Sequence, residues 1–412
     1  MAVKRWVPCA AAWCILSFCM AAFAVAPQGA GHWVGTWACA PVGEEAKAAE
    51  VAQGGPKDSS VTIRNVVHLS LGGKVLRLRI SNEYGPTPLA METVHVALSN
   101  GKDAIQSDTD HMVTFSGSPT LTIPAGKTVE SDPVKMDLPP FASLAVSMYI
   151  PQQKNVKLTY HVRALSTNYI APGDQAAATA LANPREIRTW VFLTGVDVRV
   201  SADTAAVVAY GDSITDGMVS TVDANRRWPD DLARRLQANP RTAHLTVLNE
   251  GIAGNRILYE QAGPSMLERM DRDVFGQFGV KYLVVFAGIN DLHHAVNRPD
   301  PTEKEMAPDI IAGIRRIVAR AHAHGIKVFV ATITPSGGSQ FHNPPSEAIR
   351  TAVNTWIRTG DGFDGVFDFD KAVRDTIDPT VLAKQYDSPD HTHLDDAGYQ
   401  ALADSIDLMK FQ

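Results

Sequence analysis

Two short segments, far apart in the chain, carry the residue types needed for nucleophilic catalysis. Gly211, Asp212 and Ser213 follow an apolar run at 205–210, and about 180 residues later the tetrapeptide Asp-His-Thr-His occupies 390–393. A serine hydroxyl is a weak nucleophile until a neighbouring base removes its proton, and a carboxylate keeps that base in the required tautomer and orientation. The combination predicts hydrolysis through an activated serine.

The spacing within the second segment assigns the roles. We expect Ser213 to be the nucleophile, His393 the base and Asp390, three positions earlier, the orienting acid. Asp387 is a weaker candidate for that acid, and His391 has the wrong spacing. The alternative is that these residues are not catalytic. Ser213 would then only cap a helix, and Asp390 and His393 would only form a surface turn before the last helix.

Residues suited to binding a developing negative charge follow two other predicted strands. In a parallel sheet, ligands gather beyond the carboxyl ends of the strands. The backbone amide of Gly254, the side-chain amide of Asn290 and the backbone amide of Ser213 would form an oxyanion hole, each donor contributing about 3 kcal/mol. Gly254 could instead serve only a tight turn, and Asn290 only an Asx turn. Asp212 and Asp291 are expected to be structural carboxylates that accept hydrogen bonds from nearby amides.

Metal binding is considered because several histidines stand close in pairs. No His-Glu-x-x-His or Cys-x-x-Cys spacing is present, so we expect neither a metal nor another cofactor. The pair near the end of a predicted helix fits that position without a metal, because cations are favoured there. The three pairs are His391 with His393, His293 with His294, and His322 with His324.

The C-terminal half alternates short apolar runs with helical patterns, which predicts a parallel sheet covered by helices. One helix is expected at 228–236, with Pro229 in its first turn. Another helix is expected to begin at a capping box formed by Thr302 and Glu305 and to end at Gly325. It would have an apolar stripe on one face. The five runs are 205–210, 245–248, 282–287, 328–333 and 365–369, and the stripe is Ile310, Ile314, Ile317, Val318 and Ala321.

The preceding half is rich in Thr, Val, Ser, Pro and Gly, and its apolar residues tend to alternate, as in antiparallel strands. Runs at 61–69 and 75–80 flank Gly72 and Gly73 and predict a tight hairpin. The spacing of the strands predicts an all-β, jelly-roll-like sandwich. Further strands are expected at 92–99, 113–123, 144–150 and 189–200, and a surface loop at 43–60.

The first 26 residues have the composition of a signal peptide. Lys4 and Arg5 precede an apolar stretch at 7–23, and small residues stand before Pro27. Export with cleavage is favoured over a membrane anchor, so we expect a secreted or periplasmic protein with no stable membrane anchor. Of the four cysteines only Cys39 would remain, which excludes an internal disulfide.

Length and charge limit the remaining possibilities. About 386 residues exceed what one hydrophobic core usually serves, so we expect an N-terminal β-sandwich domain at 27–203 and a catalytic domain at 204–412. The formal net charge of −6 becomes −8 without Lys4 and Arg5. With no basic stripe, this charge argues against nucleic acid as a partner.

The catalytic segments resemble the SGNH, or GDSL, hydrolase family. Four blocks match in order: Ser213 with its Gly-Asp, Gly254, Asn290 in a Gly-x-Asn-Asp sequence, and His393 in an Asp-x-x-His sequence. Ile214 stands where the family name has leucine. The resemblance implies a flavodoxin-like α/β/α fold with a five-stranded parallel sheet, and ester hydrolysis without a metal. The other hydrolase fold with a strained serine turn needs Gly-x-Ser-x-Gly, which is absent.

The whole chain is also similar to secreted two-domain members grouped with xylan-associated arylesterases and acylhydrolases. This similarity rests on Gly-Thr-Trp at 35–37 and on segments 77–85 and 332–338. It implies small-molecule or polysaccharide ester substrates, with acetyl or other short acyl groups. The alternatives are a lipase or thioesterase type of acylhydrolase, and a carbohydrate-binding protein on a catalytically silent scaffold. Trp33, Trp37 and Tyr84 could stack on sugars in that last case, although an aromatic core is the simpler reading.

Overall fold

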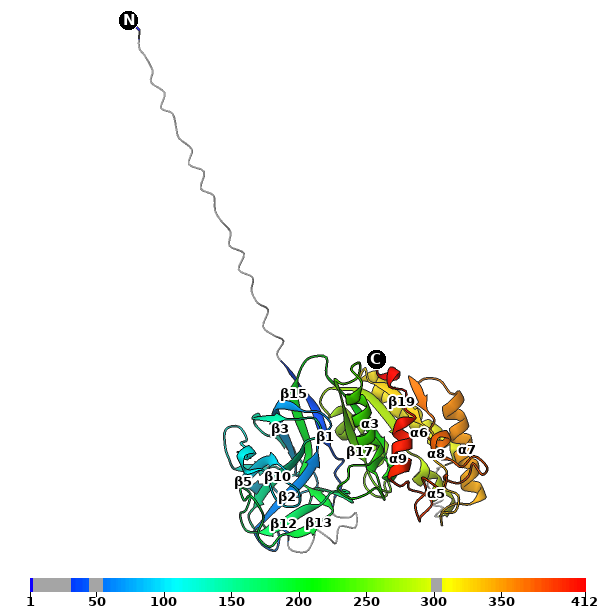
Figure 1. The fold of residues 1–412 in the computed structure, drawn as a ribbon, viewed down its shortest axis with the longest axis horizontal. Helices are drawn as coiled ribbons and strands as arrows, with labels where there is room; N and C mark the ends of the chain where they lie inside the picture. The colour runs from blue at the N-terminus through cyan, green and yellow to red at the C-terminus, as the bar shows by residue number, and fades with distance from the viewer. Residues whose placement is uncertain (3–30, 44–54, 298–305) are drawn as a thin grey trace. The chain divides into compact units, whose positions relative to one another are not determined.

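The structure is a computed structural model that describes residues 1–2, 31–43, 55–297 and 306–412 (Figure 1). Nearly all of the predicted signal peptide, most of the predicted surface loop and the Thr302–Glu305 capping box lie outside these residues. Residues 31–412 form one compact unit. No helix within the described ranges is long and apolar enough to cross a membrane.

A five-stranded parallel sheet organises the C-terminal half, as predicted. Its strands run in the order β17-β16-β18-β19-β20, which is the flavodoxin-like order. Strand β16 lies between β17 and β18 and is buried along its whole length, because it has neighbours on both edges. The strands are β16 (Ala205–Gly211), β17 (Leu245–Gly251), β18 (Val280–Phe286), β19 (Lys327–Ala331) and β20 (Gly365–Phe367).

The helices of this half pack in two groups. The first comprises α3 (Trp228–Ala238), α8 (Phe369–Val373) and α9 (Asp396–Asp404); the second comprises α4 (Met266–Met270), α5 (Ile289–Asn297), α6 (Ala307–Ala323) and α7 (Pro344–Thr359). The five residues of the predicted apolar stripe on α6 are all buried. The helix ends before Gly325, whose φ of 72° suits glycine. The predicted α/β fold of this half is confirmed.

The N-terminal half is antiparallel and β-rich, also as predicted. One sheet contains β1 (His32–Ala38), β15 (Leu193–Val200), β3 (Gly73–Ser81), β8 (Thr128–Glu130) and β9 (Val134–Leu138). The other contains β13 (Arg185–Ile187), β12 (Asn168–Pro172), β2 (Val61–His68), β10 (Ser143–Ile150), β5 (Thr93–Leu98) and β6 (His111–Met112). Side chains from both sheets share one apolar core. Trp37 belongs to it and lies edge-on to Trp190, with ring centroids 5.1 Å apart.

The predicted hairpin of 61–69 with 75–80 is wrong. Strand β2 pairs with β10 and β12, whereas β3 pairs with β15, β8 and β9 in the other sheet. The pattern misled because the arginines of β3 are buried rather than solvated. Arg77 Nε lies 3.0 Å and Arg79 Nε 3.3 Å from the buried carboxylate of Asp197 on β15. A strand face that is buried through ion pairs therefore shows the same alternation of charged and apolar residues as a strand face exposed to solvent.

Two other predicted strands are interrupted. The run at 189–200 is divided into β14 (Thr189–Val191) and β15 by Phe192, whose φ is 60°. Within 113–123 only β7 (Leu121–Ile123) is a strand, paired with β4 (Leu89–Met91). Strand β14 pairs instead with β11 (Tyr160–Val162), which bears on the site described below.

The chain passes from the antiparallel half to the parallel sheet between the end of β15 and the start of β16. Strand β1 also packs on β17, where the Thr246 hydroxyl donates to the Gly35 carbonyl at 2.7 Å. The Val247 amide donates to the Ser70 hydroxyl at 3.1 Å. The predicted domains 27–203 and 204–412 stay a prediction, since these contacts join both halves in one compact unit.

Candidate active site

Strand register brings the predicted site segments to one edge of the parallel sheet. Gly211, the last residue of β16, pairs with the last residues of both β17 and β18. Ser213 lies two residues beyond this row, Gly254 three and Asn290 four. The row crosses the point where the strand order reverses, which is where open α/β sheets bind their ligands.

The structure brings Ser213, His393 and Asp390 together in one hydrogen-bonded triad. The Ser213 Oγ lies 2.8 Å from His393 Nε2, and His393 Nδ1 lies 2.7 Å from Asp390 Oδ2. An ionised carboxylate only accepts hydrogen bonds, so Nδ1 carries the ring proton and Nε2 accepts from the serine hydroxyl. The arrangement can deprotonate the hydroxyl and stabilise the resulting imidazolium.

The Asp390 carboxylate is fixed by several donors besides the ring. Its Oδ1 accepts from the Ser388 hydroxyl at 3.0 Å, the Thr392 amide at 3.0 Å and the His393 amide at 2.9 Å. Partial burial acts to raise the pKa of Asp390, but the hydrogen bonds and charge of His393 outweigh it and hold the pKa well below its usual range. Asp390 is therefore ionised at any pH where esters are assayed.

A second acid–imidazole pair lies beside the first. His391 Nδ1 lies 2.7 Å from Asp387 Oδ2, so each carboxylate has its own ring. Asp387 therefore does not take the position of the orienting acid for His393. His391 adopts a φ of 55°, so the side chains of His391 and His393 are not directed as they would be in an extended chain.

A short helix starts at the serine itself. Helix α2 (Ser213–Asp216) has Asp212 as its N-cap, whose Oδ1 accepts from the Ile214 amide at 3.0 Å. Because the helix starts at Ser213, that residue's amide has no acceptor within it. Burial is the main cause that raises the pKa of Asp212 to about 7, and the hydrogen bond from Ile214 opposes it. Asp212 thus acts as a cap, as expected from the sequence.

Asp212→Asn is expected to gain stability relative to the wild type as pH rises from about 4 to 8. The folded pKa near 7 exceeds the value of about 3.9 in an unfolded chain, so the folded state binds the proton more tightly and loses stability as the group ionises. Each unit of difference between the folded and unfolded pKa corresponds to about 1.4 kcal/mol, so the gain in the free energy of unfolding of Asp212→Asn relative to the wild type is at most ~4 kcal/mol. Asparagine keeps the capping oxygen. Urea unfolding of both proteins at pH 4.5 and pH 8 measures the change, and a pH-independent difference would contradict it.

The loop after β17 is held by side chains from α4 and α5. Gly254 adopts a φ of 81°, and a Cβ there would lie 3.2 Å from Ala262, so the position suits glycine. The Asn290 side-chain amide donates to the Asn255 carbonyl at 3.0 Å, which leaves its second N–H for another acceptor. Arg269 Nε donates a hydrogen bond to Asn255 Oδ1 at 2.9 Å. The structure therefore joins the two predicted oxyanion segments.

Asp291 supports the same loop from the other side. Its carboxylate accepts from the Ile257 amide at 2.9 and 3.0 Å and is fully buried. This matches the structural role expected for it. His293, two residues further along α5, lies 3.1 Å from the Ser336 hydroxyl. Burial lowers the pKa of His293 to about 4, with a smaller contribution from the charges of His342 and His393, so His293 is neutral at physiological pH.

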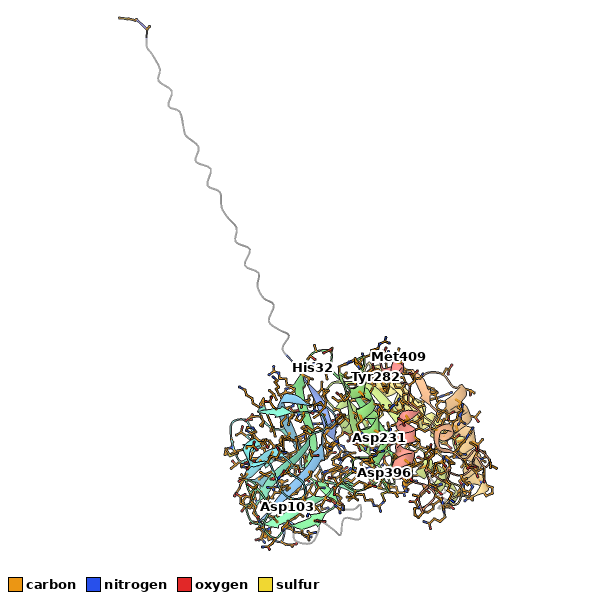
Figure 2. The ribbon with its side chains drawn as sticks, viewed as in Figure 1. His32, Asp103, Asp231, Tyr282, Asp396 and Met409 are labelled. Atoms are coloured by element: carbon orange, nitrogen blue, oxygen red, sulfur yellow. The ribbon has the colours of Figure 1, made fainter. Side chains whose placement is uncertain are left out.

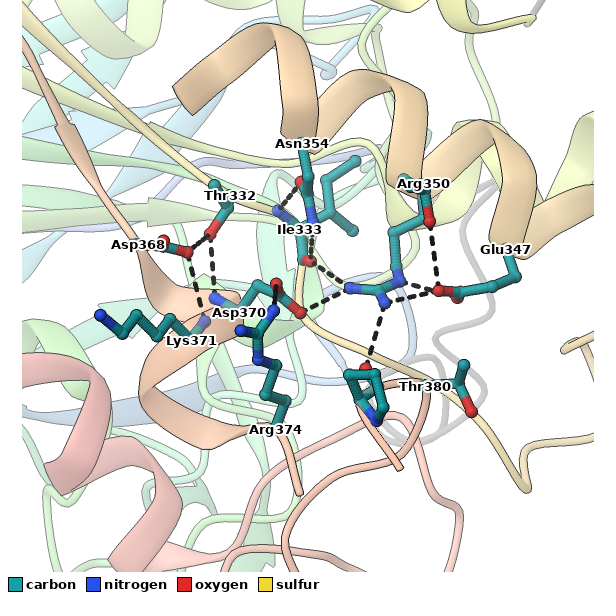
Figure 3. A network of polar contacts seen from close by, with 12 residues as sticks. Thr332, Ile333, Glu347, Arg350, Asn354, Asp368, Asp370, Lys371, Arg374 and Thr380 are labelled. Atoms are coloured by element: carbon teal, nitrogen blue, oxygen red, sulfur yellow. Dashed lines mark hydrogen bonds and ion pairs between the residues drawn. The ribbon is translucent and has the colours of Figure 1, made fainter. Parts of the chain in front are cut away.

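Polar contacts between α7 and α8 brace the loop that carries Ser336 (Figure 3). Arg350 donates to the Ile333 carbonyl at 3.2 Å and to Asp370 Oδ1 at 2.6 Å. Asn354 accepts from the Ile333 amide and donates to its carbonyl, both at 2.8 Å. These buried contacts hold the chain just after β19 in one path.

Helix α9 anchors the segment that follows the serine, which the sequence did not reveal. Asp396, labelled in Figure 2, accepts from the Thr221 amide at 2.8 Å. One turn later the Tyr399 hydroxyl donates to the Met218 carbonyl at 2.6 Å. The only signal was the polar start of the last helix. Such side-chain contacts depend on a tertiary arrangement that spacing alone does not specify.

The paired histidines have partners of other kinds. His322 Nε2 lies 2.8 Å from Asp364 Oδ2, and His324 Nδ1 lies 2.9 Å from the Arg320 carbonyl. Among the residues that the structure describes, no three His, Cys, Asp or Glu side chains form a group able to hold a metal ion.

Comparison with known proteins gives one family and a set of similar structures. Residues 209–401 match the model of the GDSL-like lipase/acylhydrolase family. The chain matches no curated protein sequence. Among solved structures, a carbohydrate acetylesterase family member from Sinorhizobium meliloti is 19% identical, with a TM-score of 0.40, and the alignment covers 50% of this chain and 99% of that one.

Two further structures are similar over the same half. An acetylxylan esterase variant from Geobacillus stearothermophilus is 19% identical, with a TM-score of 0.40 and coverage of 50% of this chain and 93% of its own. The M. smegmatis aryl esterase is 16% identical, with a TM-score of 0.39 and coverage of 49% and 96%.

Proposed function

We propose that this carboxylic ester hydrolase, whose residues 209–401 belong to the GDSL-like lipase/acylhydrolase family, cleaves short-chain acyl esters through an acyl-enzyme on Ser213. The observation that carries the proposal is the relay from Ser213 Oγ to His393 Nε2, 2.8 Å, and from His393 Nδ1 to Asp390, 2.7 Å. This is the geometry that activates a serine hydroxyl.

In the first half-reaction the Ser213 oxygen attacks the ester carbonyl carbon while His393 Nε2 takes its proton. The carbonyl oxygen becomes an oxyanion, and Asp390 stabilises the charged ring without taking its proton. His393 then donates this proton to the alkoxy oxygen as the C–O bond breaks. An alcohol leaves and the acyl group stays on Ser213.

The oxyanion would be bound by the Ser213 amide, the Gly254 amide and the free N–H of Asn290. The start of α2 at Ser213 and the contact of Asn290 with the Gly254 loop support this assignment. Donors fixed before the reaction need no reorganisation when charge develops, which makes each worth about 10²–10³ in kcat.

In the second half-reaction a water takes the place of the alcohol. His393 accepts one proton of that water as its oxygen attacks the acyl carbon, and the second tetrahedral intermediate uses the same donors. Collapse returns the proton to Ser213 Oγ and releases the carboxylic acid. Water is the only co-reactant, so the cycle needs no cofactor.

A hollow next to Asn290 favours a small polar ester. It has a volume of about 90 Å³ and is lined by Gln261, Asn290, His293, His294, Asn297 and Phe341. An apolar cavity of about 150 Å³ holds one benzene molecule, so this hollow suits an acyl group of few carbons. Its amides and imidazoles supply hydrogen-bond partners for a sugar or aryl ester better than for a fatty chain. We propose acetylated carbohydrate or aryl esters as substrates of an exported enzyme.

Covalent labelling tests the nucleophile directly. A fluorophosphonate probe should add to Ser213, identified by mass spectrometry of the peptide, because only an activated serine reacts. Boiled protein is the control. Absence of labelling in folded protein would favour the carbohydrate-binding alternative on a silent scaffold.

A substrate series tests the acyl chain length. Rates on nitrophenyl esters should be highest for acetate and fall as the chain lengthens, and acetylated xylan oligomers should release acetate. An optimum at eight or more carbons would support a lipase-type acylhydrolase instead.

A further inference from the structure

One carboxylate joins the serine helix to the loop of the predicted oxyanion donor. Asp216 ends α2, three residues after Ser213, and its Oδ2 accepts from the Ala253 amide at 3.2 Å. Ala253 directly precedes Gly254. The position of Asp216 therefore fixes the Gly254 peptide relative to the nucleophile.

The other oxygen of Asp216 is bound by a histidine from the antiparallel half. His161, on β11, places Nε2 3.0 Å from Asp216 Oδ1. Its second nitrogen, Nδ1, lies 2.8 Å from the Ala40 carbonyl of the segment after β1. The side chains of both His161 and Asp216 are about 5% exposed, and Trp190 lies over the ring at 5.5 Å between centroids.

The partners of His161 indicate that the ring is a cation. A carbonyl only accepts hydrogen bonds, and so does an ionised carboxylate, so both ring nitrogens must donate. Burial acts to lower the pKa of His161, but the charge and hydrogen bond of Asp216, with the Ala40 carbonyl, raise it above its usual value. A buried ion pair with both partners hydrogen-bonded has a defined geometry.

Other charged groups near this pair are accounted for. A small cavity beside it is lined by Cys39, His68, Arg227 and Asp230 as well as by the pair itself. The Arg227 guanidinium opposes a positive charge on His161, but it is bound to Asp230, with Nε 2.5 Å and Nη2 3.1 Å from the carboxylate oxygens. Burial lowers the pKa of the His68 ring, and burial raises that of the Cys39 thiol, so both are neutral. Within the described ranges, His161 is thus the cation that is hydrogen-bonded to Asp216, whereas Arg227 acts on Asp216 through its charge.

We propose that His161 is a positioning residue for ester hydrolysis: its imidazolium holds Asp216 against the Ala253 amide and so sets the Gly254 N–H where the oxyanion forms. The antiparallel half thereby completes the catalytic geometry of the parallel half. This inference rests on the proposed function. It assigns to the β-rich half a part in the reaction that requires no contact with the substrate.

His161→Ala tests the proposal in the full chain with 4-nitrophenyl acetate. We expect kcat to fall by about 100-fold, since a misplacement near 1 Å costs about that much, while KM changes less than threefold. His161→Gln retains a donor for Asp216 without the charge, and it should recover about tenfold of the loss. A residue needed only for folding would not give this separation of kcat from KM, nor the partial recovery.

Glu83→Gln is the matched control. Glu83, in the antiparallel half, lies 3.0 Å from Arg272 of the other half, and it belongs neither to α2 nor to the 253–254 loop. It should leave kcat unchanged, and its effect on the melting temperature measures the loss of one contact between the halves.

The outcomes separate the two proposals. If the wild type does not hydrolyse the ester, or if Ser213→Ala hydrolyses it as fast, the proposed function fails and this inference fails with it. If the wild type is active and folded His161→Ala keeps kcat within threefold, or Glu83→Gln loses as much, only the role of His161 is overturned. Should His161→Ala not fold, His161→Gln decides, because wild-type kcat there contradicts the proposal and a tenfold loss at constant KM supports it.

Discussion

Ser213→Ala is expected to lower kcat for 4-nitrophenyl acetate by about 10⁶, the loss seen when a triad nucleophile is removed from a serine hydrolase. The variant keeps every donor assigned to the oxyanion but has no atom to form the acyl-enzyme. Binding survives, so KM should change little. Stopped assays at high enzyme concentration measure the residual rate, which should remain about 10³–10⁴ above that in water because the donors still act.

Ser220→Ala is the control for this comparison. Ser220 lies seven residues further along and is buried, and its hydroxyl has no hydrogen-bond partner among the described residues, so its loss should leave kcat unchanged. A Ser213→Ala protein with more than a hundredth of wild-type activity would show that another group attacks the ester. The first group to suspect would then be a water activated by His393.

The order of elements in the parallel half follows from the sequence because its strands are buried on both faces. Such strands need continuous apolar runs, and each run ends where polar residues must meet the strand's carboxyl end. Gly211, Gly254 and Asn290 all follow such runs, so their meeting at one edge needs only parallel strands in register. The sequence contained the information for that part of the site.

Contacts between the halves could not be predicted in the same way. His161 has no neighbouring motif, and its partner Asp216 is 55 residues away. Their pairing depends on how β11 packs against α2. The arginines of β3 show the same difficulty, since a buried ion pair with Asp197 gives the alternation of a half-exposed strand. Where burial is achieved by charge pairing, a pattern of polar and apolar residues does not identify the buried face.

Asp390→Asn is expected to lower kcat by about 10⁴, because asparagine can present an N–H to His393 Nδ1 and stabilise the wrong tautomer of the ring. The Oδ1 bonds from Ser388, Thr392 and the His393 amide should keep the loop in place. The loss is then one of proton transfer and not of folding. Circular dichroism and fluorophosphonate labelling rates, measured beside kcat, distinguish these cases.

The neighbouring pair supplies a control of the same chemistry. Asp387→Asn removes a carboxylate of the same type, 2.7 Å from His391, yet should keep kcat within about threefold of wild type. If instead Asp387→Asn lost 10⁴ and Asp390→Asn little, His391 and Asp387 would be the working pair. The 2.8 Å contact between Ser213 and His393 would then have to break before catalysis.

Because Asp390 is ionised well below neutral pH, the difference in kcat between Asp390→Asn and the wild type should persist to the acid end of the assay range. A carboxylate with an ordinary pKa would lose its effect as pH fell through about 4.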